Sequence, residues 1–149
     1  MSDDLHSKYQ EFVKNGDVES VLILKGHLVI EELLTMAITA TTGSEKEITE
    51  AKLSFSQKRL IAKALAGPNK SDGIWKIIDT LNKLRNDVGH NLTPQKSENL
   101  VDKLRSQLIG RDSVAYGLIP NPNDSNQIIS HAVSFSIGFL EAYLRERNA

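Results

Sequence analysis

The most constraining feature of this chain is the helical spacing of apolar residues between positions 71 and 91. Isoleucine, leucine and valine recur there every three or four residues, the spacing that lines one face of an α-helix, whereas a strand alternates with a period of two. The residues of this stripe are Ile74, Ile77, Ile78, Leu81, Leu84 and Val88. The segment therefore predicts an amphipathic helix whose apolar face must be covered by other parts of the chain.

The same helical period runs through most of the chain, and Ser54, followed three residues later by Gln57, matches a capping box at a helix start. The expected helices cover residues 5–13, 17–40, 54–67, 71–91, 97–110 and about 124–146, with a loop at 111–123. We find no convincing pair of strands. Short connections favour antiparallel neighbours, so we predict an all-α, up-and-down helical bundle of about five to six helices. It forms one domain over residues 1–149, with a motif-bearing core at about 18–110.

Composition restricts the chemistry and the location of the protein. The chain has no cysteine, which excludes disulfides and thiolate sites, and its 40% hydrophobic and 25% charged residues are typical of a globular domain. The most apolar stretch, residues 18–40, is interrupted by Lys25, His27, Glu31 and Glu32. This favours a buried central helix, the most buried of the bundle, over a membrane span. The acidic start lacks an apolar leader, so we expect a cytoplasmic protein without a membrane partner.

Positive charge is concentrated in residues 51–70, which contain no acidic residue, although the net charge of the chain is −1. That total argues against a protein that coats nucleic acid non-specifically. Lys58, Arg59 and Lys63 are nevertheless candidates to bind nucleic-acid phosphates. The alternative, and the more common reason for a run of charge, is a solvated helix face.

Arg85, Asn86 and His90 stand at the end of the expected 71–91 helix. Arginine offers a permanently charged group for phosphate oxygens, and histidine exchanges a proton near neutral pH. On an unbroken helix the Arg85 and His90 side chains point about 140° apart, whereas Asn86 and His90 share a face. Gly89 permits a departure from helical geometry that would turn His90 towards the target of Arg85. The alternative is structural, because basic side chains near a helix C-terminus interact favourably with its dipole.

The other histidines have structural interpretations. His27 and Glu31 are spaced to share a helix face, but no third metal ligand accompanies them, so a hydrogen-bonded core histidine is the favoured interpretation. His131 lies among apolar residues and is explained by helix packing. Trp75 suits either the edge of the core or a protein interface. We therefore predict no metal site and no cofactor.

The string Leu-Arg-Asn-Asp-Val-Gly-His at residues 84–90 resembles the arginine, polar residue, three residues, histidine motif of the HEPN superfamily. Residues 24–36 resemble the long preceding helix of small bacterial members, and residues 53–58 resemble the segment that opens their third helix. The similarity covers about residues 18–95, roughly the central half of the chain.

The resemblance implies an all-α bundle, often dimeric, whose active members are metal-independent endoribonucleases. It maps the catalytic arginine, its polar follower and the catalytic histidine onto Arg85, Asn86 and His90. The chain departs from toxin members that have a tyrosine two places after the histidine, because Leu92 stands there. The same segments also resemble the mannitol operon repressor family, whose members are regulators and not nucleases.

These features support two functional hypotheses. The first is a metal-independent endoribonuclease of a toxin–antitoxin or defence system, with RNA as substrate and an antitoxin or regulatory protein as partner. RNA cleavage needs an acid and a base, and the motif has one histidine, so a homodimer is expected, with Trp75 and Val88 near a candidate dimer edge. The second is a non-catalytic helical transcriptional regulator or protein-interaction module. The sequence does not identify the RNA or DNA target, the partner or the operon.

Overall fold

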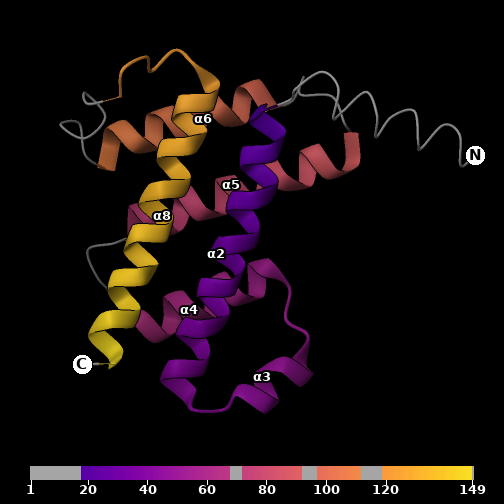
Figure 1. Cartoon of the computed structure of the whole chain (residues 1–149), viewed down its shortest axis with the longest axis vertical. Helices are drawn as coiled ribbons and strands as arrows, with labels where there is room; N and C mark the ends of the chain where they lie inside the picture. Colours follow the sequence, from indigo (N-terminus) through magenta and orange to yellow (C-terminus); the bar gives the residue numbers. More distant parts are fainter. Residues whose placement is uncertain (1–17, 68–71, 92–96, 112–118, 149) are drawn as a thin grey trace, which may run out of the picture.

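The computed structural model describes residues 18–67, 72–91, 97–111 and 119–148. These residues form six helices and no strand (Figure 1). The helices are α2 (Val18–Thr42), α3 (Glu45–Ala51), α4 (Phe55–Ala66), α5 (Asp72–Asn91), α6 (Ser97–Arg111) and α8 (Ser125–Asn148). The predicted all-α fold is confirmed for this part of the chain. The expected helix at 5–13 and most of the expected loop at 111–123 lie outside the described residues.

α2 and α8 lie side by side and run in the same direction, and α4, α5 and α6 form a second layer behind them (Figure 1). Gly26 packs against Val133 in the first half of the pair, and Thr41 Oγ1 lies 3.2 Å from the Tyr143 hydroxyl near its end. The most extensive helix packing in the described fold therefore joins two helices that are far apart in sequence.

The sequence neighbours α4 and α5 run antiparallel, as a short connection between helices favours. Asn82 Nδ2 donates to Ser56 Oγ at 3.2 Å, and the Arg59 guanidinium lies 3.6 Å from an Asp79 carboxylate oxygen. The later residue of α4 contacts the earlier residue of α5, so the two helices run antiparallel.

The start of α4 is capped as the sequence predicts. The backbone N–H of Gln57 donates to Ser54 Oγ at 3.2 Å, and the N–H of Ser54 donates to Gln57 Oε1 at 2.9 Å. The short helix α3 was not predicted. It follows Gly43, which has a φ of +68° and lies directly after the end of α2. None of the residues of α3 is buried, so its sequence lacks a strong apolar period.

The core is built around α5, whose predicted stripe is confirmed: its residues, from Ile74 to Val88, are all buried. Trp75 is also buried and packs edge-on against Phe139, with ring centroids 5.6 Å apart. The suggestion of a dimer edge beside Trp75 and Val88 is therefore wrong, because only 3% and 4% of these residues are exposed.

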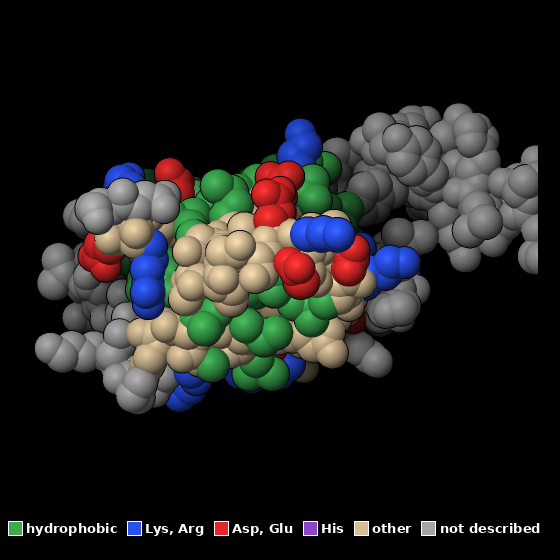
Figure 2. Space-filling model, turned by 90° about the horizontal axis from the view of Figure 1, so that it is seen from below, with side chains coloured by type: hydrophobic (Ala, Val, Ile, Leu, Met, Phe, Trp, Pro, Cys, Tyr) green, Lys and Arg blue, Asp and Glu red, His purple; other side chains and the backbone are tan. Residues whose placement is uncertain are grey.

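α2 is central but not buried on all sides. It packs against α3, α4, α5 and α8, and its inner face contributes Ile23, Ile30, Leu34 and Ile38 to the core. Val21, Leu28 and Met36 lie at its surface, which corrects the prediction that this is the most buried helix of the bundle. Figure 2 shows hydrophobic side chains exposed among charged ones at the end of the molecule that carries α3. Within the described residues, no helix is long and apolar enough to cross a membrane.

Candidate functional site at the end of α5

Arg85, Asn86 and His90 lie in the last turns of α5, whose inner face is anchored by the buried stripe. Arg85 is half-buried and Asn86 is exposed. The His90 side chain lies outside the described residues, although its backbone belongs to α5. The helix continues through Gly89 to Asn91, so the expectation that Gly89 interrupts it is wrong. On a continuous helix, positions 86 and 90 fall on one face, and positions 85 and 90 are about 140° apart around the axis.

A buried polar network lies one turn before Arg85 and joins three helices. His27 of α2 is 2.9 Å from Asn82 of α5, and because the Asn82 Oδ1 can only accept, His27 Nε2 donates this hydrogen bond. Asn82 Nδ2 donates in turn to Ser56 Oγ of α4. The His27 ring stacks on Phe55, with centroids 4.0 Å apart and an interplanar angle of 22°. This satisfied core environment supports the structural interpretation of His27.

The electrostatics of His27 connect this network to Arg85. Burial lowers the pKa of His27 below its usual 6.5, and the positive charge of Arg85 lowers it further. The hydrogen bond that His27 donates to Asn82 and the negative charge of Glu31 oppose this shift. His27 is consequently neutral at pH 7, with Nε2 carrying the proton, and Arg85 lies close enough for its charge to act on the ring.

Two of the three predicted nucleic-acid-binding residues are engaged in partly buried ion pairs between helices. Lys58 Nζ lies 3.1 Å from Glu31 Oε1, and Arg59 pairs with Asp79. Only 16% and 15% of the Lys58 and Arg59 side chains are exposed. A phosphate chain would have to compete with these carboxylates for both cations. Lys63 is half-buried on the same helix.

Sequence reasoning missed Asn82 as part of this region. The available signal was a polar residue between Leu81 and Leu84, within the buried stripe of α5. A buried amide needs hydrogen-bond partners, so its position predicts a polar network beneath the helix. The identity of the partners, His27 and Ser56, depends on how α2 and α4 pack.

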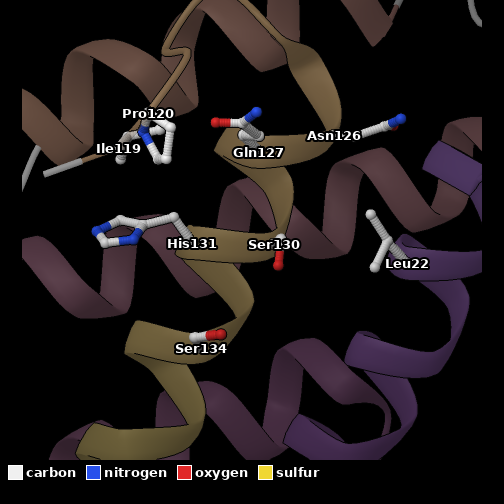
Figure 3. Close-up of a pocket in the computed structure, with 8 residues that line it drawn as sticks. All are labelled: Leu22, Ile119, Pro120, Asn126, Gln127, Ser130, His131 and Ser134. Atoms are coloured by element: carbon white, nitrogen blue, oxygen red, sulfur yellow. The ribbon is translucent and has the colours of Figure 1, made fainter.

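A separate pocket of about 470 Å³ lies between the start of α8 and α2 (Figure 3). The ring of His131 extends towards Ile119 and Pro120, while Leu22 approaches from α2 (Figure 3). The remaining lining residues are Asn126, Gln127, Ser130 and Ser134. His131 Nε2 is buried without a hydrogen-bond partner in the described part of the chain, and burial lowers the pKa of His131. Among the described residues that line it, there is neither an arginine nor a second titratable group, so these residues do not supply an acid–base pair for phosphate chemistry.

In the described ranges, no group of three or more histidine, aspartate or glutamate residues is arranged to hold a metal ion. Comparison of the chain with protein-family models, with curated proteins and with solved structures finds no match. The interpretation of the α5 end therefore rests on the chemistry and placement of its own residues.

Proposed function

We propose that the protein is a HEPN-like, metal-independent endoribonuclease whose site is the end of α5. The observation that carries the proposal is the placement of Arg85, Asn86 and His90 on the final turns of a helix that the core holds in place. Arg85 is half-buried, which suits a group that must reach a phosphate while remaining oriented by the protein. The sequence resemblance to the HEPN motif supports the same three residues.

In the proposed reaction, His90 removes the proton of a 2′-hydroxyl, and the oxygen attacks the adjacent phosphorus. The guanidinium of Arg85 stabilises the negative charge that develops on the phosphate oxygens. The bond from phosphorus to the 5′-oxygen breaks, and an acid returns a proton to that oxygen. The products are a 2′,3′-cyclic phosphate and a 5′-hydroxyl, so no redox partner or metal is needed.

A homodimer would supply the second proton-transfer group. One chain offers one His90, and on the continuous α5 the positions of Arg85 and His90 are about 140° apart around the axis. A two-fold arrangement can combine the arginine of one protomer with the histidine of its partner, and two histidines can then serve as base and acid. A toxin or defence role, with an antitoxin or regulatory protein as partner, belongs to the same proposal.

The test is RNA cleavage by purified wild-type protein, Arg85→Ala and His90→Ala, each with and without EDTA. We expect cleavage by the wild type in both conditions and its loss in both variants. Arg145→Ala, which changes an exposed arginine near the end of α8, is the matched control and should cleave normally. Cleavage that persists in His90→Ala, or that EDTA abolishes, would refute the proposed chemistry.

A second candidate function is a non-catalytic regulator or interaction module, similar to the mannitol operon repressor family. The specific observation in its favour is the row of exposed apolar side chains on α2, Val21, Leu28, Val29 and Met36. The pairing of Lys58 and Arg59 with carboxylates of neighbouring helices points the same way. Under this alternative the wild-type protein binds a macromolecular partner but leaves RNA intact. The cleavage assay therefore separates the two functions.

A further inference from the structure

The outer face of α2 carries a row of apolar side chains that the core does not cover. Val21, Leu28, Val29 and Met36 are 41%, 62%, 40% and 55% exposed. On an α-helix these positions fall within an arc of about 100° and extend for roughly 20 Å along the axis. Exposed apolar residues aligned along one helix face indicate a surface for a partner, because scattered exposed residues would not align.

Two opposite charges lie within the same row. Lys25 and Glu32 are both exposed, and neither forms an ion pair with any residue in the described ranges. Their neighbour Glu31 is different, because it is already paired with Lys58 of α4. The outer face of α2 therefore offers one positive and one negative group to an incoming surface.

We infer that this face pairs with the same face of a second copy of the chain, with the two α2 helices antiparallel. A two-fold axis between Leu28 and Val29 would place Val21 opposite the partner's Met36 and Lys25 opposite the partner's Glu32. The exposed positions of the row are thus arranged symmetrically in sequence, with apolar residues facing apolar residues and the cation facing the anion. Two-fold symmetry repeats each of these contacts.

The charges also select the direction of pairing. A parallel arrangement in register would place Lys25 against the partner's Lys25 and Glu32 against the partner's Glu32, and both contacts are repulsive. The antiparallel arrangement replaces these contacts with two attractive pairs. A second copy of the chain can pair every apolar and charged residue of this face, because each residue finds its counterpart on the same face of the partner.

A groove beside the row suits this arrangement. It has a volume of about 380 Å³ and is lined by Leu28, Glu31, Glu32, Thr35, Met36 and Lys58. The antiparallel partner would bring its own Val21 and Lys25 to this groove, next to Met36 and Glu32. The partner's Val21 then packs against Met36, and the partner's Lys25 lies beside the Glu32 carboxylate.

The inference goes beyond the proposed function. α5 packs against the inner face of α2 through Asn82 and His27, so the α2 pairing does not itself bring two α5 ends together, and it does not require RNA cleavage. His90→Ala changes a residue at the end of α5 and should remain dimeric while it loses cleavage. Loss of cleavage and loss of the dimer are consequently distinguishable results.

The experiment measures mass by sedimentation equilibrium for the wild type, Lys25→Glu and Glu32→Lys, with circular dichroism as a check of folding. The wild type should be a dimer. Each single variant creates like-charge contacts across the two-fold axis and should raise the dimer dissociation constant roughly tenfold or more. An equimolar mixture of the two variants should recover a dimer, because it restores two opposite-charge pairs. Lys103→Glu, which reverses an exposed charge on α6, is the control and should dimerise as the wild type does.

Three results would overturn the inference. A wild-type protein that stays monomeric at about 100 µM would exclude a stable dimer of any kind. A dimer that both single variants leave intact would place the interface elsewhere. Single variants that weaken the dimer but do not recover it on mixing would exclude the antiparallel pairing of Lys25 with the partner's Glu32.

Discussion

Gly26 lies so close to Val133 that a Cβ atom on the glycine would be 2.7 Å from the valine Cγ2. The missing side chain at Gly26 therefore allows α2 and α8 to pack at their observed separation. His27 follows directly in the chain, so the same contact helps to position the polar network beneath Arg85.

Gly26→Ala should lower the free energy of unfolding by about 1 kcal/mol. The added methyl group overpacks the α2–α8 contact at a cost of about 1–3 kcal/mol. The higher helix propensity of alanine offsets roughly 1 kcal/mol of this cost, which leaves a net loss of about 1 kcal/mol. Urea unfolding measures the change. Gly138→Ala is the control, because a Cβ there meets nothing within 4 Å, and it should raise stability. Equal stabilisation by both substitutions would show that Gly26 is not a tight contact.

Asn82→Ala should destabilise the protein by about 1–3 kcal/mol, because it leaves the buried His27 Nε2–H and Ser56 without their common partner. Asn86→Ala removes the same side chain from an exposed position on the same helix, and it should change stability by less than about 0.5 kcal/mol. Urea unfolding of both variants gives the comparison. Similar losses in the two would mean that the amide network contributes little.

Stability should fall as the pH is lowered through about 6.5. Burial lowers the pKa of both His27 and His131 in the folded protein below the usual value of 6.5, so the unfolded chain binds these protons first. Their contribution to stability is complete above the unfolded pKa and is lost as the pH falls towards the folded pKa. Urea unfolding between about pH 7.5 and pH 5 should show this loss, and His27→Gln should make the profile flatter. An unchanged profile in His27→Gln would contradict the assignment to His27.

Arg85→Gln should raise the pKa of His27, whereas Glu31→Gln should lower it further. The reason is that the Arg85 charge disfavours the protonated ring and the Glu31 charge favours it. Titration of the His27 ring signals by NMR in the wild type and both variants measures the direction of each shift. Shifts of the same sign in the two variants would rule out this charge arrangement.

The helices themselves were largely predictable from the sequence. The buried residues of α5 follow its apolar period, and the start of α4 follows from Ser54 and Gln57. These features depend on residues three or four positions apart, so the local pattern contains the information. α3 was missed because only Ile48 among its residues is a partly buried hydrophobic. The position of Arg85, Asn86 and His90 near the end of a helix was likewise readable from the chain.

The tertiary structure decided which helices meet and which apolar residues remain outside. His27 and Asn82 are 55 positions apart, and Thr41 and Tyr143 are 102 positions apart, so no local pattern specifies either contact. The apolar composition of α2 predicted the most buried helix of the bundle, but its neighbours cover only part of its circumference and leave Leu28 and Met36 at the surface. The spacing of apolar residues thus determined where the helices form. The packing of whole helices against one another determined their arrangement, because the burial of a residue depends on its neighbours and not on its type alone.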